Sequence, residues 1–441
     1  MNINELLEGV ECTCGRHHTC SIQSVYIEKD AIKHLTGICN GYQNVLLVAD
    51  ENTFAAAGEA AVTALMAQAT PISQDTAHGY RTVSGGRAKT IRKVIFPGSI
   101  ILVPNEAAIE TVTTQLNGID FIVGVGSGVI QDLCKYVSHY NKIPYAIVAT
   151  APSMDGYASD GAAMITDGMK VTYPAGLPVA IVADTTVLAN APMEMLKAGY
   201  GDIIGKFSAL NDWKLSHLMI GEYFCQYIYD ITMAQIQKTI HLAEGILKRD
   251  EESVKTLTEA LVVIGVMMSF AGSSRPASGS EHHLSHFFEI TGLLHGQDYF
   301  PHGIDVAYGT VITAEIREKL ATQQLPEQVY RPNQEAYLSK MEEIYKTSAA
   351  GCITLQEKVG RYQDTDMQKY RRKETSMRTI LAEMPSAEEI KHLLSLVALD
   401  INEFYDLYGT DKINDAVLYA KELKDRYSVL WINYDFNGGE K

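Results

Sequence analysis

The sequence predicts an α/β domain with a parallel sheet, followed by an all-α domain. Strand and helix signals alternate over the first 185 residues, a glycine cluster joins one of these strands to a helix, and helix formers dominate from residue 186 onward. Alternation of helices with near-continuous apolar strands is typical of a parallel sheet that is covered on both faces. We therefore expect two domains, residues 1–185 and residues 186–441.

In the first domain the signals follow one another closely. Apolar runs predict strands at 44–50, 99–103, 121–125 and 144–148. Helix formers predict helices at 52–68, 105–116 and 131–139. Asn52 or Thr53 could cap the first of these helices, and Asn105 opens the second.

The second domain reads as helical throughout. Helices are expected at 186–196, 202–221, 232–248, 252–271, 282–294, 303–320, 334–345 and 387–396. Residues 323–333 are mostly polar with two prolines, which predicts a surface loop. The charged, weakly periodic segment 355–384 has no assignment.

The composition describes a globular chain and limits its partners. Of 441 residues, 46% are hydrophobic and 20% charged, which excludes a disordered chain. Lys and Arg number 37 against 53 Asp and Glu, so the net charge is −16. Because phosphate backbones require a basic face, nucleic acid is not expected as a partner. An anionic small molecule needs only a local positive site.

The cysteines and apolar stretches predict a cytoplasmic protein. Seven cysteines at irregular spacings do not form a disulfide framework. The first residues lack the basic and apolar regions of a signal peptide. The most apolar stretch, 260–270, is too short to cross a bilayer, so no membrane insertion is expected.

A glycine turn is the first candidate site. A strand enters it, Gly124, Gly126 and Gly128 follow, and a helix leaves. Backbone N–H groups at such a turn and the helix N-terminus can hold a pyrophosphate. The match to G-x-G-x-x-G/A is imperfect because Val129 occupies the third position, and a tight turn without a ligand is the alternative. Asp50 ends an earlier predicted strand. Its carboxylate could bind the adenosine ribose, which weakly favours NAD because a carboxylate there repels the 2′-phosphate of NADP. The alternative is that Asp50 only caps a helix.

An acid–histidine set is the second candidate site. His282 and His286 share one helical face, and His302 begins a later helix. One carboxylate, from Asp202, and two of these imidazoles could hold a divalent ion and leave one position for substrate. Zinc, nickel and iron(II) all accept these donors. Single histidines are more often ordinary core or surface residues, and His283 points away from the shared face, so it is expected to be structural.

A second group of possible ligands lies near the N-terminus. Cys12, Cys14 and Cys20 surround His17 and His18. Their spacing does not match the usual zinc ribbons or fingers, so we favour a loop with free thiols.

The sequence contains five motifs in a fixed order: GVGSGVIQD (124–132), TAPSMD (150–155), GYGD (199–202), the His282–His286 pair and PHG (301–303). In these motifs and their order the chain resembles the iron-containing alcohol dehydrogenase, glycerol dehydrogenase and dehydroquinate synthase superfamily. The sequences of segments 153–156, 202–206 and 275–282 resemble those of the bacterial sn-glycerol-1-phosphate dehydrogenases. The N-terminal Cys-x-Cys-Gly motif and the histidines after it are similar to that branch as well. The resemblance spans residues 10 to 320 and implies a dehydroquinate synthase-like fold. In such a fold an α/β dinucleotide-binding domain, here 1–185, is followed by a helical metal- and substrate-binding domain, here 186–441.

The resemblance also implies roles for single residues. Asp202, His282 and His302 match metal-binding positions, and these three with His286 form the catalytic set. Substrate contacts are implied for Asp155, Asp202 and His286. Nucleotide contacts are implied for Asp50, Gly126, Ser127, Gly128, Val129, Ile130, Gln131, Asp132, Thr150, Ala151, Pro152, Ser153 and Ser159. Val125 replaces a glycine of the superfamily pattern, a change we expect to be tolerated if its side chain faces the core.

The implied reaction is the reduction of dihydroxyacetone phosphate to sn-glycerol 1-phosphate with NAD(H) or NADP(H) and one divalent ion, zinc or nickel with iron possible. His286 could relay a proton or support the neighbouring ligand. Lys206 and Arg275 are candidates for the substrate phosphate, although either could instead pair with an acid. A homo-oligomer, with a dimer favoured, is expected by default.

Three other functions remain open. A glycerol dehydrogenase would use an unphosphorylated polyol and would not need Lys206 or Arg275. A dehydroquinate synthase-like lyase usually carries a glutamate at the position of Asp202, which counts against it. A non-enzymatic nucleotide- or metal-binding protein would not consume NADH.

Overall fold

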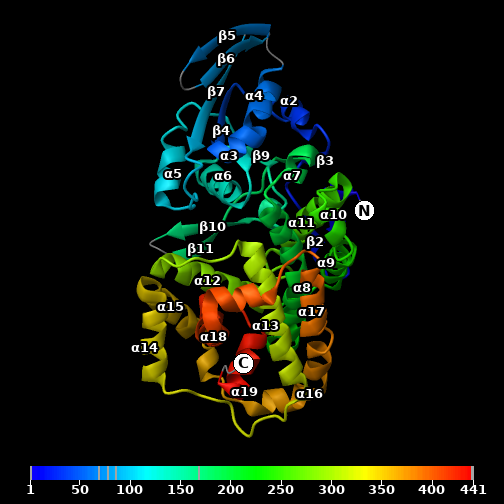
Figure 1. Ribbon diagram of the computed structural model, residues 1–441, viewed down its shortest axis with the longest axis vertical. Coiled ribbons are helices and arrows are strands. Elements are labelled where there is room, and N and C mark those ends of the chain that lie inside the picture. Colours follow the sequence, from blue (N-terminus) through cyan, green and yellow to red (C-terminus); the bar gives the residue numbers. More distant parts are fainter. Residues whose placement is uncertain (1, 68–69, 77–78, 85–86, 167–168, 439–441) are drawn as a thin grey trace. The chain divides into compact units, whose positions relative to one another are not determined.

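The computed structural model describes residues 2–67, 70–76, 79–84, 87–166 and 169–438 (Figure 1). The chain forms two compact units, residues 1–199 with 244–273 and residues 200–243 with 274–441. The expected division was a single boundary after residue 185, which would place helix α11 (Glu251–Ala271) in the second domain. In the structure α11 belongs to the first unit, because it packs on helix α7 (Thr185–Ala189) and turn η3 (Gly156–Ala158). The first unit is therefore made of two separate segments of the chain.

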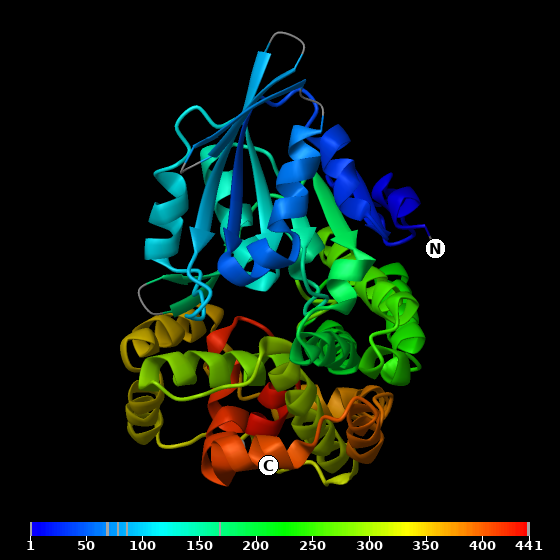
Figure 2. The same cartoon turned by 45° about the horizontal axis from the view of Figure 1, so that its top comes forward.

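A mixed sheet forms the centre of the first unit (Figures 1 and 2). Its strand order is β3 (Ser24–Glu28), β12 (Ala180–Asp184), β9 (Tyr145–Ala149), β8 (Phe121–Gly126), β4 (Asn44–Asp50), β7 (Arg87–Phe96), β6 (Gly79–Ser84) and β5 (Thr70–Thr76). The six strands from β3 to β7 are parallel, and β6 and β5 add an antiparallel edge. The expected parallel sheet is confirmed.

The order of the strands creates a switch point at β4. The chain passes from β4 to β7 on one side and then to β8 on the other side of β4. In open α/β sheets, ligands bind at such a point, outside the carboxyl ends of the strands. Asp50 and Gly126 are the last residues of β4 and β8, so the fold brings these two sequence signals to the same edge.

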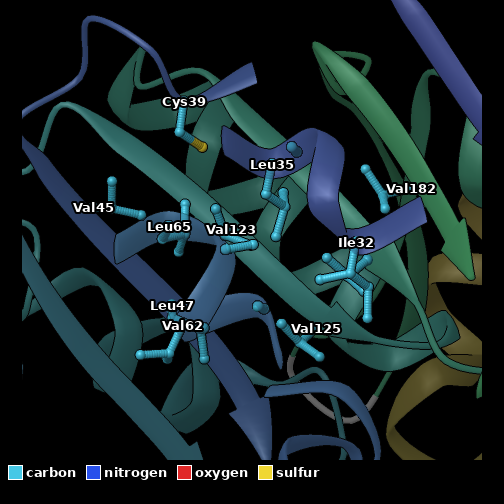
Figure 3. Packing of buried hydrophobic residues seen from close by; sticks show 14 of the residues in the cluster. Ile32, Leu35, Cys39, Val45, Leu47, Val62, Leu65, Val123, Val125 and Val182 are labelled. Atoms are coloured by element: carbon cyan, nitrogen blue, oxygen red, sulfur yellow. The ribbon is translucent and has the colours of Figure 1, made fainter. Parts of the chain in front are cut away.

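Helices cover both faces of this sheet. One face is packed against η1 (Ala31–His34), α2 (Leu35–Ile38) and α4 (Glu59–Met66), and Figure 3 shows Leu47, Val123 and Val125 within this core. Helix α6 (Gly128–Asn141) contacts β8, β4 and β9. Val125 is fully buried, which confirms that its side chain faces the core.

One strand prediction in the first unit needs correction. Residues 99–103 form no strand; Ile100 and Ile101 are 72% and 82% exposed in a turn and the loop that follows it. The strand is β7, just upstream, whose apolar residues are interrupted by Arg92 and Lys93. The hairpin of β10 (Gly161–Thr166) and β11 (Met169–Pro174) was not predicted, and neither were strands β3, β5, β6 and β12. The predicted strand 44–50 coincides with β4.

The predicted helices of the first unit are mostly found. Residues 52–68 form α3 (Glu51–Thr53), the π-helical turn η2 (Phe54–Gly58) and α4, and 105–116 contain α5 (Glu106–Thr113). The stretch 232–248, expected in the second domain, splits into α9 (Gln226–Thr239), which lies in the second unit, and α10 (Ala243–Leu247), most of which lies in the first. Among the described residues only α11 is long and apolar enough to span a bilayer, and 78% of its most apolar window is buried, as in a core helix.

The second unit is all-α over residues 200–243 and 274–438. Besides most of α8 (Met193–Ile220), its elements include α12 (Ser280–His295), α13 (His302–Thr322), α14 (Gln334–Tyr345), α15 (Ala349–Val359), α16 (Met367–Leu381), α17 (Ala387–Ser395), α18 (Ile401–Tyr419) and α19 (Val429–Asn437). The unassigned segment 355–384 is mainly helical, since it holds the end of α15 and all of α16. Residues 323–333 lie outside helices and strands, as predicted.

Candidate metal centre and nucleotide-binding turn

Three helices of the second unit bring the predicted metal donors together. Asp202 comes from α8, His282 from α12 and His302 from the first position of α13. One ligand atom from each of these residues lies within 4.8 Å of the other two. Three side chains separated by up to 100 residues thus converge on one point, with donor types that suit a divalent ion.

Small residues on α8 allow this convergence. A Cβ added at Gly201 would lie 2.6 Å from the carbonyl oxygen of Gly303, and one at Gly205 would lie 2.4 Å from Cγ1 of Val306. No side chain fits at such distances, so both glycines let α8 approach α13 closely. Asp202, between them, is thereby carried to the start of α13, where His302 lies.

The His282 ring is oriented by the residue before it. Its Nδ1 lies 2.7 Å from Oε1 of Glu281, and its Nε2 faces Oδ1 of Asp202 at 3.5 Å. A carboxylate can only accept, so Nδ1 carries the proton and Nε2 keeps its lone pair for an ion. Oε1 of Glu281 also accepts from the backbone N–H of Gly279 at 2.7 Å, which fixes the carboxylate. The sequence analysis did not predict this contact between Glu281 and His282.

The His302 ring has a hydroxyl partner. Its Nδ1 lies 3.1 Å from Oγ of Ser285, which leaves Nε2 for an ion. The His286 ring lies close by, with its centroid 5.5 Å from that of His302 and 6.2 Å from that of His282. Asp202 and His282 are buried, whereas His286 and His302 are partly exposed. A small molecule could therefore reach the group from the side of the two exposed rings.

The two candidate phosphate-binding cations are already paired. Nζ of Lys206 lies 2.6 Å from Oδ1 of Asp202, and both side chains are fully buried. The guanidinium of Arg275 binds the carboxylate of Glu222 at 2.8–3.0 Å and donates to the carbonyl oxygen of Tyr427. Arg275 therefore forms a structural ion pair with Glu222. Lys206 holds the carboxylate of Asp202, which lies one helical turn before it on α8.

The glycine turn of the first unit ends β8 and begins α6. Ser127 occupies the N-cap position, and α6 starts at Gly128. A Cβ at Gly126 would lie 2.5 Å from Cβ of Ile130, so this glycine is needed for packing. A Cβ at Gly128 would meet only Met154, at 3.8 Å. The space in front of Gly128 is therefore open enough for a ligand to approach the backbone N–H groups at the start of α6.

Several residues expected at the nucleotide have buried side chains. Ile130 lies in the core, and Gln131 donates from Nε2 to the Tyr157 carbonyl at 3.0 Å, so these side chains are held inside the protein. Asp50 accepts from the backbone N–H of Thr53 at 2.8 Å and caps α3. Asp50 thus has a helix-capping role in addition to any role at a ribose.

Lys135 links the remaining segments of this region, and the sequence analysis did not single it out. Its buried Nζ donates to the carbonyl oxygens of Gly156 (3.0 Å) and Gly161 (2.8 Å) and to Oγ of Ser159 (3.2 Å), and it lies 3.5 Å from Asp132. Burial lowers the pKa of Lys135 from its usual range. This lysine fixes the loop that contains Ser159 onto α6.

The other predicted residues also lie in the first unit. Ala151 is buried, and its carbonyl oxygen accepts from the Tyr157 hydroxyl at 2.8 Å. Val129 lies at the start of α6. The loop after β9 contains Thr150, Pro152 and Ser153, and Asp155 directly precedes η3. Asp155 and Thr150 are 8% and 7% exposed.

Comparison with known proteins identifies the family. The iron-containing alcohol dehydrogenase family model matches residues 26–192. Glycerol-1-phosphate dehydrogenase [NAD(P)+] of Halalkalibacterium halodurans is 34% identical over 323 residues, which cover 71% of this chain and 76% of that protein. The same-named protein of Pyrobaculum islandicum is 38% identical over 237 residues, 53% of this chain and 68% of that protein.

A solved structure agrees at the level of fold. Sulfoacetaldehyde reductase from Bifidobacterium kashiwanohense, in complex with NAD+, matches with a TM-score of 0.58 and 13% identity, over 95% of this chain and 97% of that one. The expected fold class is confirmed. The sequence relatives show that the chain belongs to the glycerol-1-phosphate dehydrogenases of the iron-containing alcohol dehydrogenase family, which are NAD(P)-dependent oxidoreductases.

Proposed function

We propose that this protein reduces dihydroxyacetone phosphate to sn-glycerol 1-phosphate, reversibly, with NADH or NADPH and a divalent ion held by Asp202, His282 and His302. The convergence of these three donors within 4.8 Å is the observation that carries the proposal. The names of the relatives support the substrate and the use of either nucleotide. Zinc or nickel suits the two imidazoles and the carboxylate, and iron(II) is also compatible.

The chemistry divides between the bound groups and the chain. A bound divalent ion would polarise the substrate carbonyl, and a bound nicotinamide would supply the hydride. Asp202 brings a negative charge to the ion, and Glu281 and Ser285 keep Nε2 of the two histidines available. Lys206 holds the Asp202 carboxylate in place. An imidazole nitrogen of His286 gives the proton to the substrate oxygen, directly or through water.

In the first unit, the nucleotide pyrophosphate is assigned to the backbone at Gly126, Ser127 and Gly128, with the loops at 150–153 and Ser159 beside it. Asp50, at the switch point, is assigned to the adenosine ribose, which weakly favours NAD. Asp155 is assigned to the substrate. A cytoplasmic homodimer is the assembly we expect for such an enzyme.

The decisive experiment is a chiral product assay. The protein is stripped with a chelator, reloaded separately with zinc, nickel and iron(II), and supplied with dihydroxyacetone phosphate and each nucleotide. We expect oxidation of at least one nucleotide and formation of sn-glycerol 1-phosphate only with metal present. Activity with glycerol but not with the phosphate would indicate a polyol dehydrogenase, and no nucleotide oxidation with any metal would refute a dehydrogenase.

A variant pair connects this activity to the metal group. Asp202→Ala removes one of the three proposed ligands, so turnover should be lost while the circular dichroism spectrum remains that of a helical protein. Asp298→Ala, at an exposed position of the same unit, is the matched control and should keep full activity. Full activity of the Asp202 variant would exclude the proposed role of that carboxylate.

A further inference from the structure

A second cluster of metal-type donors lies in the N-terminal hairpin of the first unit. Strand β1 (Val10–Glu11) pairs antiparallel with β2 (His17–His18). Sulfur atoms of Cys12 and Cys14 and a ring nitrogen of His18 lie within 4.8 Å of one another. The Cys-x-Cys spacing favoured a loop with free thiols, but the structure gathers both thiols at one imidazole.

The turn between the strands explains how both sulfur atoms meet. The backbone N–H of Gly15 donates to the carbonyl oxygen of Cys12 at 3.0 Å, and the N–H of Cys12 donates to the carbonyl oxygen of Arg16 at 3.2 Å. Gly15 has φ +83°, a left-handed conformation that favours glycine. The chain therefore reverses within four residues and keeps Cys12 and Cys14 at the closed end of the hairpin.

The histidine of this cluster is oriented as a ligand. Nδ1 of His18 lies 3.0 Å from the carbonyl oxygen of Phe270, at the end of α11. A carbonyl can only accept, so Nδ1 carries the proton and Nε2 has the lone pair. Nε2 lies 3.5 Å from Sγ of Cys14. A backbone carbonyl on the far ring nitrogen is the usual second partner of a metal-bound histidine.

Burial separates the two adjacent histidines. The His18 side chain is 1% exposed and its ring is stacked on Phe270, with centroids 5.4 Å apart. The His17 ring is half exposed and forms an ion pair with Glu11 at 2.8 Å. Successive residues of a strand point to opposite faces, so only His18 can join the cysteines.

We propose that Cys12, Cys14 and His18 bind one structural zinc ion. Two thiolates and one imidazole are the donors that tetrahedral zinc prefers, and a fourth donor completes such a site. Through the His18–Phe270 contact, the ion fastens the N-terminal hairpin to the end of α11. The proposal does not depend on the proposed function, because the acid–histidine group of the second unit contains no sulfur.

Cobalt(II) distinguishes the two donor groups in the whole protein. Cobalt bound by thiolates gives an intense near-ultraviolet charge-transfer band, which carboxylate and imidazole ligands do not give. We expect this band in cobalt-loaded wild type and in Asp202→Ala, and we expect it to be absent from Cys14→Ser. No such band in the wild type, loaded after full reduction of its thiols, would overturn the proposal without any variant having to fold.

Metal analysis of the protein purified with zinc gives an independent readout. Cys12→Ser and Cys14→Ser should each lose one zinc per chain relative to wild type and melt at a lower temperature. Cys20→Ser, which removes a similarly half-buried thiol of the same segment, is the matched control and should keep its zinc. The same analysis of serine variants of the other cysteines identifies a fourth thiolate donor. Unchanged zinc in Cys12→Ser and Cys14→Ser would show that these thiols only hydrogen bond to His18.

Discussion

The two units build their candidate sites from different parts of the chain. In the second unit the candidate site consists of side chains, and the imidazoles of His282 and His302 have partners, Glu281 and Ser285. In the first unit the candidate site is mainly backbone, since the side chains of Ile130 and Gln131 point into the core. Replacing side chains of the candidate metal group should therefore lower its activity. At the glycine turn, a substitution should impair nucleotide binding only if it adds atoms to a glycine.

The largest effect is expected at a metal ligand. His302→Ala removes one of three donors from a partly exposed position at the start of α13, so the fold should persist. Loss of several kcal/mol of transition-state stabilisation lowers kcat/KM by about 1000-fold or more. Steady-state kinetics with parallel metal analysis measures this. A decrease below tenfold, with metal retained, would contradict the assignment of His302.

A smaller effect, on metal affinity, is expected at Glu281, which contacts the proposed ligand His282. Glu281→Gln keeps the size of the side chain and an oxygen for the Gly279 N–H but removes the charge that orients His282. Loss of such a partner typically weakens metal affinity by about 10–100-fold. Competition with a chromogenic chelator gives the affinity, and Glu289→Gln on the same helix is the control. Equal affinities of the two variants would make Glu281 a packing residue only.

The donors of the candidate metal group could be named from the sequence, but the residues that orient them could not. The His282–His286 spacing and the PHG motif place imidazoles at definite positions on helices. Glu281 directly precedes His282, and helical neighbours one residue apart do not normally face each other. Ser285 meets His302 only after α12 and α13 have packed together. Spacing predicts ligands, whereas these partners depend on tertiary contacts.

The fold could likewise be predicted only where the local sequence determines the structure. Strand β4 was predicted at its observed bounds because its apolar run is continuous and lies in the core. The run at 99–103 is equally apolar, yet Ile100 and Ile101 are exposed, so apolar character alone does not make a strand. The discontinuous first unit could not be predicted, because the packing of α11 against η3 and α7 involves residues about 100 and 70 positions away.

At the glycine turn, two neighbouring glycines should give different phenotypes. Gly128→Ala adds a methyl group where only Met154 is near, at 3.8 Å, so stability should hardly change. The methyl group would stand in the path of a bound pyrophosphate, and we expect KM for the nucleotide to rise about tenfold. Gly126→Ala adds its methyl group 2.5 Å from Ile130 and should lower the melting temperature. If both variants lower only the melting temperature, the turn serves packing alone.

The smallest effect is expected at His283, which belongs to neither the ligand set nor the turn. Burial, reinforced by nearby Lys424 and Arg426, holds the pKa of His283 well below its usual value. The unfolded chain takes up a proton near pH 6.5 and the folded protein does not, so the free energy of unfolding decreases as the pH falls below that value. The slope from this one group is at most about 1.4 kcal/mol per pH unit.

His283→Phe should make stability less sensitive to acid. Within the described residues neither ring nitrogen of His283 has a hydrogen-bond partner, so phenylalanine keeps the ring and loses no such bond. Urea unfolding of the metal-stripped protein between pH 7 and pH 5 measures the effect, with exposed His392→Phe as the control. The control changes a side chain that is exposed, so its curve should follow that of the wild type. Parallel curves for all three proteins would mean that the folded protein accepts a proton at His283, so that this part of the second unit is wetter than its packing indicates.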